Sequence, residues 1–260
     1  AARLASAGGR PLSLSAASVE PTQAVAAGDR CTVESFKWDN IVVALKRLPR
    51  DGADVESSFL REQTVLAQAP MGHPNLMRLF ATVDDGPTRG LVFELFPRGS
   101  LDQFLRSTQP LEPATAVRVA IAAIRGAAAL HSVGIVHRAI RPAHIMLESD
   151  LSDAHLAGFG AAVRLEAATE AATLVPNRYT PPETLDAAAR PAPNADVWQL
   201  GLLALNLITR KPPFASHPEE ADALAALAAA ESPGTLTDDA RDQSPFLASV
   251  MDLAIVHTPS

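Results

Sequence analysis

The sequence predicts an α+β fold in two lobes, a small β-rich N-terminal lobe with one helix and a larger helical C-terminal lobe. Strand-like runs surround a single helical segment before residue 97, and helical spacing dominates from residue 100 onward. The run Val197–Ile208 is apolar nearly all round, which predicts a helix buried on every side as the axis of the second lobe. A chain of 260 residues can bury a sizeable core.

The N-terminal lobe is expected to consist of four strands and one helix. Runs rich in β-branched residues predict the strands, and the turn-forming Asp84-Asp85-Gly86-Pro87 separates the last two. Apolar residues recur on one side of the helical segment and polar residues on the other. The expected elements are strands Val25–Val33 and Asn40–Leu48, helix Glu56–Gln68, and strands Leu76–Val83 and Gly90–Phe96.

The C-terminal lobe is expected to be helical around a long polar loop region. Ser100 is a suitable N-cap for a short helix to Leu105, and Pro113 a suitable first residue for a long helix that ends by Gly134. Unusual polar residues gather between His137 and Glu183, where a rigid scaffold would carry the functional loops. Further helices are expected at Val197–Ile208, Glu219–Ala230 and Pro245–Ile255.

Composition and charge narrow the partners. The formal net charge of -7 and the absence of Lys/Arg clusters argue against a nucleic acid or an anionic membrane as partner. Cys31 is the only cysteine, so we expect neither an internal disulfide nor a thiolate zinc site, and a cytoplasmic location. The apolar runs are too short or too interrupted to predict a transmembrane helix. We expect a flexible leader at 1–21, the N-terminal lobe at 22–97, and a C-terminal lobe at 98–260 that is cut short at its C-terminal end.

A series of short motifs, from about Ala26 to the C-terminus, resembles that of the protein-kinase family in order and spacing. The motifs are Val43-Ala44-Leu45-Lys46, Glu62 in Phe-Leu-Arg-Glu, His73-Pro74-Asn75, Phe93-Glu94-Leu95-Phe96, His137-Arg138, Gly158-Phe159-Gly160, Pro182-Glu183 and Asp196-Val197-Trp198. Chance matches rarely keep both order and interval, so the resemblance implies a bilobal protein-kinase-like fold.

The resemblance also implies a set of nucleotide-binding residues. In the family a strand lysine contacts the phosphates and pairs with a helix glutamate, which corresponds here to Lys46 and Glu62. The glycine-rich loop is degraded, with only Gly28 left of three family glycines. The full implied set is Gly28, Val33, Ala44, Lys46, Glu62, Glu94, Phe96 and Met146.

Three positions depart from the family's catalytic pattern. Where the family places a catalytic aspartate, a metal-binding asparagine and a metal-binding aspartate, this chain has Ala139, His144 and Gly158. Alanine and glycine offer no group that accepts a proton or binds magnesium, and neutral histidine prefers softer metals. We therefore expect no catalytic residues, no metal site and no enzymatic activity, so that the chain is a pseudokinase.

The family's internal hydrophobic stack is present in the sequence and would favour an assembled shape. Its implied members are Leu66, Leu79, His137, Phe159 and Asp196, the last anchoring the base of the stack. For each apolar member taken singly, ordinary core packing is the simpler interpretation.

The stretch His137 to Gly160 is similar to that of the STRAD adaptor pseudokinases, which carry the same kinds of replacement. That resemblance implies ATP as a ligand with weak or no magnesium dependence, and an allosteric or scaffolding role. The expected partner is another protein kinase or an adjoining domain of the parent chain. Lys46 is a departure from the adaptors.

Two alternatives remain open from the sequence. The chain could be a weakly active serine/threonine kinase in which Glu148, Asp150 or Asp153 acts as a displaced acid. It could also be a structural scaffold of kinase shape whose cleft is collapsed. Nucleotide binding separates the scaffold from the regulator, and phosphate transfer separates the weak kinase from both.

Overall fold

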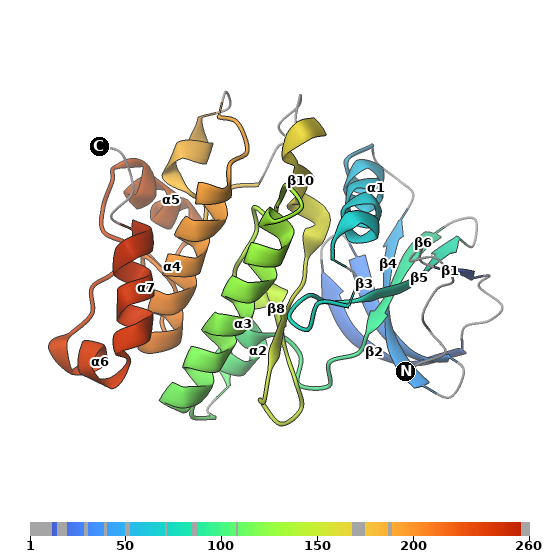
Figure 1. Cartoon of the computed structure of the whole chain (residues 1–260), viewed down its shortest axis with the longest axis horizontal. Coiled ribbons are helices and arrows are strands. Elements are labelled where there is room, and N and C mark those ends of the chain that lie inside the picture. The colour runs from blue at the N-terminus through green and yellow to red at the C-terminus, as the bar shows by residue number, and fades with distance from the viewer. Residues whose placement is uncertain are drawn as a thin grey trace.

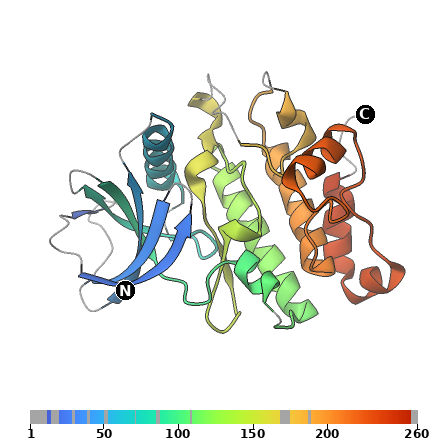
Figure 2. The same ribbon diagram turned by 180° about the vertical axis from the view of Figure 1, so that it is seen from behind.

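The computed structural model describes residues 12–14, 20–28, 31–38, 41–49, 53–70, 72–84, 88–107, 109–167, 175–186 and 189–255. These residues form two lobes, a sheet with one helix on one side of the molecule and a group of helices on the other (Figures 1 and 2). The predicted α+β class with a β-rich first lobe and a helical second lobe is confirmed.

A six-stranded sheet forms the N-terminal lobe, in the strand order β1-β5-β6-β4-β3-β2. Neighbouring strands are antiparallel except β1 and β5, which are parallel. The strands are β1 (Leu12–Leu14), β2 (Glu20–Gly28), β3 (Cys31–Trp38), β4 (Ile41–Pro49), β5 (Leu79–Asp84) and β6 (Thr88–Glu94).

Helix α1 (Ala53–Gln68) belongs to the N-terminal lobe, and the other α-helices of the described residues lie in the C-terminal lobe. These are α2 (Leu101–Arg106), α3 (Pro113–His131), α4 (Pro193–Thr209), α5 (Glu220–Ala228), α6 (Asp238–Gln243) and α7 (Pro245–Ile255). Two small antiparallel sheets lie among them, formed by β7 (Ile135–Val136) with β10 (Val163–Arg164), and by β8 (Ile145–Leu147) with β9 (Ala154–Leu156).

Local sequence signals explain where several helices begin. Ser100 caps α2 in a capping box, because its hydroxyl accepts from the Gln103 amide while the Gln103 side chain accepts from the Ser100 amide. Helices α3 and α4 each begin with a proline, whose missing N–H would have no partner in the first turn.

The structure differs from the expected elements in several places, and the short strands β7 to β10 are among them. The single strand expected at Val25–Val33 is two strands, β2 and β3, in which Gly28 pairs with Cys31 across a chain reversal. Helix α6 was not expected, because it is short and polar; the Thr237 hydroxyl caps it by accepting from the Ala240 amide. The segment expected to be a flexible leader contains strand β1, which pairs with β5.

One hydrophobic core joins the two lobes. It includes Leu66 and Phe93 from the N-terminal lobe and Leu147, Phe159 and Leu203 from the C-terminal lobe. A separate cluster covers the opposite face of the sheet, and another surrounds α5. Helix α4 lies centrally in the second lobe, as expected, although Val197 is exposed and the helix is not enclosed on every side.

Among the described residues, α3 is the one helix long and apolar enough to cross a membrane by length and composition alone. Half of its apolar window is buried inside the protein, and the helix packs on α4 and β9. Core helices of globular proteins have the same properties.

The chain after α1 is fixed to the C-terminal lobe by Asn75. Its side-chain amide donates to the Asp153 carboxylate at 2.8 Å and to the Ala154 carbonyl at 3.1 Å. The backbone carbonyl of Asn75 accepts from the Leu156 amide at 2.9 Å. Gly126 of α3 faces this loop, and a Cβ there would lie 2.7 Å from the Asn75 carbonyl oxygen. The lobes therefore meet here with no room for a side chain.

Gly126→Ala tests this contact, because two effects oppose each other. Helix propensity alone favours alanine by about 1 kcal/mol, whereas forcing a methyl group against fixed backbone costs about 1–3 kcal/mol. We expect the clash to dominate and the melting temperature to fall by about 3–6 °C. The reverse change at the exposed Ala128, Ala128→Gly, reports propensity alone on the same helix. A more stable Gly126→Ala protein would mean that the lobes separate easily at this point.

Candidate functional site

An ion pair joins the sheet to α1. Lys46 lies on β4, in register with Val33 on β3 and Leu91 on β6, and its Nζ lies 2.6 Å from Oε2 of Glu62. The Glu62 side chain is 1% exposed, so its carboxylate depends on this partner for the solvation that water no longer provides. Helix α1 is thereby held against the strand that carries the lysine.

Two residues of α1 that precede Glu62 contact the turn that follows β9. Arg61 donates to the Gly160 carbonyl at 3.0 Å, and the Ser58 hydroxyl lies 3.5 Å from the same oxygen. A Cβ at Gly160 would lie 2.9 Å from the Ser58 hydroxyl, so glycine permits the close approach. Arg61 and Ser58 are not among the residues predicted for the site from the sequence. Their spacing of three residues, which puts them on one face of a helix, was the available signal.

The loop from His137 to Arg141 is anchored to α4 through buried polar groups. Asp196, which is fully buried, accepts from the backbone amides of His137 and Arg138 at 2.8 and 2.7 Å and bonds His131 Nε2 at 2.8 Å. The Gln199 side chain accepts from the Ile140 amide and donates to the Arg138 carbonyl. Gln199 was also missed, since a lone polar residue in an apolar helix gave no indication of its partner.

The five implied members of the hydrophobic stack come from different elements, from α1 in the N-terminal lobe to α4 in the C-terminal lobe. Leu66 and Leu79 are buried in the core that also contains Phe159. The His137 ring contacts the Phe159 ring edge-on, with centroids 5.2 Å apart, and Asp196 holds the His137 amide.

His144 and Gly158 lie against each other. The His144 ring donates from Nδ1 to the Ala139 carbonyl at 2.7 Å. Gly158 has a left-handed backbone (φ 78°, ψ 51°), and a Cβ there would lie 2.5 Å from Cγ of His144. The pKa of His144 is lowered to about 3, chiefly because burial disfavours the charged ring and secondly because the Arg141 guanidinium repels it. The ring is therefore neutral at physiological pH.

We call Lys46, Glu62, Arg141, His144 and Gly158 the inter-lobe site. Its members come from both lobes, and the charge of Lys46 is near enough to contribute to the lowered pKa of His144. The Arg141 Nε is buried with no hydrogen-bond partner among the described atoms. Two cations and one carboxylate thus share the site with a neutral imidazole.

The other implied nucleotide-binding residues occupy several elements. Val33 and Ala44 lie on the face of the sheet that carries Lys46, because Val33 pairs with Lys46 and Ala44 is two residues away. Phe96 is buried, its ring contacts the His155 ring at a tilted angle with centroids 4.7 Å apart, and its backbone carbonyl accepts from the Gly99 amide. The remaining three are Gly28 at the end of β2, Glu94 at the end of β6 and Met146 on β8.

The acids considered as displaced catalysts lie at the far end of the β8–β9 hairpin. Glu148 bonds His155, Asp153 accepts from Asn75, and Asp150 is exposed and accepts from the Ser152 amide. The hairpin strands separate them from His144 by about 10 Å, at about 3.3 Å per residue. These acids are engaged elsewhere in this arrangement.

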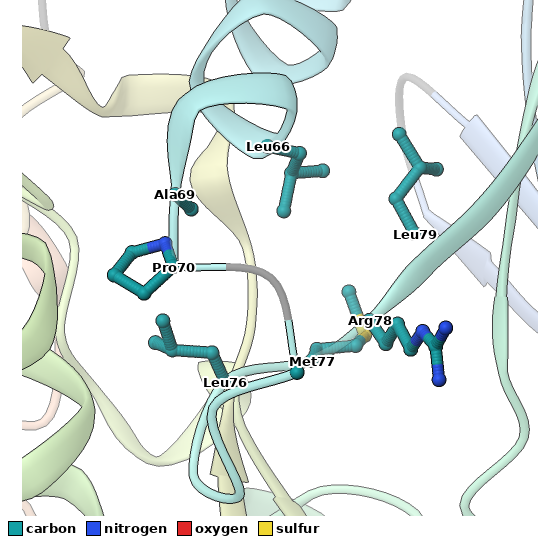
Figure 3. Close-up of a pocket in the computed structure, with 8 residues that line it drawn as sticks. Leu66, Ala69, Pro70, Leu76, Met77, Arg78 and Leu79 are labelled. Carbon is teal, nitrogen blue, oxygen red and sulfur yellow. The ribbon is translucent and has the colours of Figure 1, made fainter. Parts of the chain in front are cut away.

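A small pocket lies at the C-terminal end of α1, and none of its lining residues belongs to the inter-lobe site (Figure 3). It is lined by apolar side chains that include Leu66, Leu76 and Leu79, with Arg78 at its edge. The cavity volume of about 10 Å³ is roughly what a single water molecule needs. This pocket does not suit an organic ligand.

Comparison with known proteins agrees with this geometry. A family model described as protein kinase domain matches residues 21–253, and the chain belongs to this family. The serine/threonine-protein kinase PkaA of Streptomyces coelicolor is 31% identical over 195 residues, covering 72% of this chain and 35% of that protein. The probable serine/threonine-protein kinases PBL2 and PBL18 of Arabidopsis thaliana are 34% and 31% identical, covering 65% and 71% of this chain and 41% and 48% of their own lengths. The chain spans a third to a half of these relatives.

The expectation that the chain is not an enzyme is contradicted by these relatives. They are named serine/threonine-protein kinases, and they point to an enzymatic kinase. The expectation rested on three side chains, and the relatives are matched over most of the chain. Protein kinase domains bind ATP, so the ligand class follows from the family.

Residues 139, 144 and 158 do not fit the magnesium ion that usually accompanies ATP in this family. Magnesium requires octahedral oxygen ligands at about 2.1 Å, and these positions offer a methyl group, a neutral imidazole and no side chain. Among the described residues, no group of three or more His, Cys, Asp or Glu side chains is placed to hold a metal.

The neutral His144 predicts a pH dependence of stability. Its pKa is lower in the folded chain than in the unfolded chain, so between about pH 6.5 and 3 the unfolded chain binds more protons. Stability from this group is complete above pH 6.5 and is lost as the pH falls.

We expect the urea midpoint to fall between pH 7 and pH 5.5, and the fall to be smaller in His144→Asn. Wild type and His144→Asn share every other titratable group, so the difference between their pH slopes measures this ring. An equal slope in wild type and His144→Asn would show that the ring is already charged in the folded protein.

Proposed function

We propose that this kinase-family domain binds ATP at the inter-lobe site with weak or no dependence on magnesium, and that binding regulates another protein kinase or an adjoining domain of the same chain. The Lys46–Glu62 ion pair is the observation that supports it most, because a lysine held beside a buried carboxylate is ready to meet a phosphate. The assembled pair also argues against a collapsed scaffold.

Arg141 supports the weak magnesium dependence. Its guanidinium lies close enough to His144 to lower the pKa of that ring, and its buried Nε has no partner among the described atoms. Arginine binds phosphate oxygens through paired N–H groups. Together with Lys46 it would offset triphosphate charge that magnesium offsets elsewhere in the family.

The regulatory part of the proposal rests on the connection between the site and α1. Nucleotide at Lys46 acts on Glu62, and the neighbouring Arg61 binds the Gly160 carbonyl. A change at the phosphates would thus reach α1 and the turn after β9 together. The local likeness of His137 to Gly160 to STRAD adaptors supports a role in controlling a partner kinase.

Thermal unfolding with ATP tests the binding. A ligand at about 100 times its Kd stabilises the folded state by about 2.7 kcal/mol, which should raise the melting temperature by about 5–10 °C. We expect a similar rise in magnesium and in chelator. The rise should disappear in Lys46→Met/Glu62→Met, which removes both charges so that no buried carboxylate is left alone.

Lys211→Met is the control for that experiment, since Lys211 is an exposed lysine outside the site. It should keep the full temperature shift. No shift in the wild type at millimolar ATP would refute ATP binding, and a shift seen only with magnesium would refute the metal-independent part.

A second candidate function is serine/threonine phosphorylation itself, which the class of the relatives favours. Incubation with γ-labelled ATP and a serine/threonine peptide should then label the peptide. Lys46→Met/Glu62→Met should abolish the labelling, and Lys211→Met should leave it unchanged, which excludes a contaminating kinase. Labelling at the level of a protein-free blank would reject this candidate.

A further inference from the structure

The fixed position of His144 beside Gly158 has consequences for metal binding. A Cβ at Gly158 would lie 2.5, 2.6 and 2.8 Å from the Cγ, Cδ2 and Nδ1 atoms of His144. Each distance is well inside van der Waals contact, and all three atoms belong to one rigid ring. The conflict is therefore with the face of the imidazole and not with the end of a flexible side chain.

His144 cannot easily move aside. Its Nδ1 donates to the Ala139 carbonyl, its amide donates to the Arg141 carbonyl at 2.8 Å, and its own carbonyl accepts from the Ala157 amide at 2.8 Å. Both ends of the residue are thus bonded to neighbouring backbone. Moving the ring would break the Nδ1 bond in a partly buried site, where an unpaired polar group is costly.

We infer that the imidazole of His144 fills the space that a metal-binding carboxylate at residue 158 would need, so that positions 144 and 158 form one coupled unit closed to divalent cations. The inference rests on the proposed function only in placing nucleotide phosphates beside this unit. The coupling itself is a property of the protein without nucleotide.

The contact with the His144 ring, more than charge or backbone conformation, excludes the carboxylate. Lys46 and Arg141 both lie near His144, so a new negative charge there would be attracted. The left-handed backbone of Gly158 is one that aspartate and asparagine tolerate better than other residues. A single Gly158→Asp change should therefore fail to create a metal site, because the His144 ring occupies the space that the carboxylate needs.

A stability cycle tests the coupling. Gly158→Ala is compared in the wild type and in the His144→Ala background by thermal unfolding. The left-handed strain is the same in both, so any difference measures the contact with the ring. We expect Gly158→Ala to lower the melting temperature by several degrees more when His144 is present.

Gly134→Ala is the matched control, because Gly134 has a similar left-handed backbone (φ 72°) and a Cβ at this position would have no described neighbouring atom within 4 Å. It should show the strain alone. Equal losses for Gly158→Ala in both backgrounds, or a loss no larger than that of Gly134→Ala, would overturn the inference.

Metal titration tests the closed position directly. Mn²⁺ alone, without nucleotide, is titrated into Gly158→Asp, His144→Asn/Gly158→Asp and His144→Asn/Gly158→Asn, with binding followed by electron paramagnetic resonance. We expect His144→Asn/Gly158→Asp to bind Mn²⁺ at least about 10-fold more tightly than the isosteric His144→Asn/Gly158→Asn. Gly158→Asp alone should bind no more tightly than wild type.

Tight Mn²⁺ binding by Gly158→Asp alone would show that His144 moves aside and would overturn the inference. The inference would also be overturned if folded His144→Asn/Gly158→Asp bound Mn²⁺ no better than His144→Asn/Gly158→Asn. If a variant fails to fold, the alanine cycle gives the answer. Because ATP is absent from both experiments, their failure is distinct from a failure of ATP binding.

Discussion

The arrangement of the site depends on one buried ion pair. Glu62 is removed from water and has Lys46 as its partner at 2.6 Å, so α1 cannot leave the sheet without exposing or abandoning a charge. The position of α1 in turn places Arg61 on the Gly160 carbonyl, and the turn it binds carries Gly158 and Phe159. A single electrostatic constraint thus extends from the sheet into the second lobe.

The second lobe contributes the Arg141 cation and the neutral His144 to the inter-lobe site. Asp196 fixes the loop after β7 through two amides, and His144 is held neutral by burial and by the nearby cations. The positive charges of Lys46 and Arg141 are therefore the main charges available to a bound anion beside Glu62. This balance is the basis of our proposal that ATP binds with weak or no magnesium dependence, in a chain that belongs to the protein-kinase family.

Much of the fold could be predicted because its signals are local. The proline and serine helix starts, the apolar axis of α4 and the β-branched strands were visible in the sequence. The β2–β3 hairpin was missed although Gly28-Asp29 is a turn signal in the sequence, and α6 was missed because its residues are almost all polar. Arg61 and Gln199 were missed for another reason, since their partners are backbone carbonyls or amides more than fifty residues away.

The continuous core across the lobes has a consequence for how the protein behaves as a whole. Leu66 and Phe93 pack in the same cluster as Phe159 and Leu203, so the largest hydrophobic core is shared between the two lobes. Melting of one lobe would strip apolar surface from the other, and the two should lose their structure in one concerted event. A fragment cut between the lobes would expose apolar surface and tend to aggregate. The inter-lobe site therefore stays intact only as long as the entire domain does.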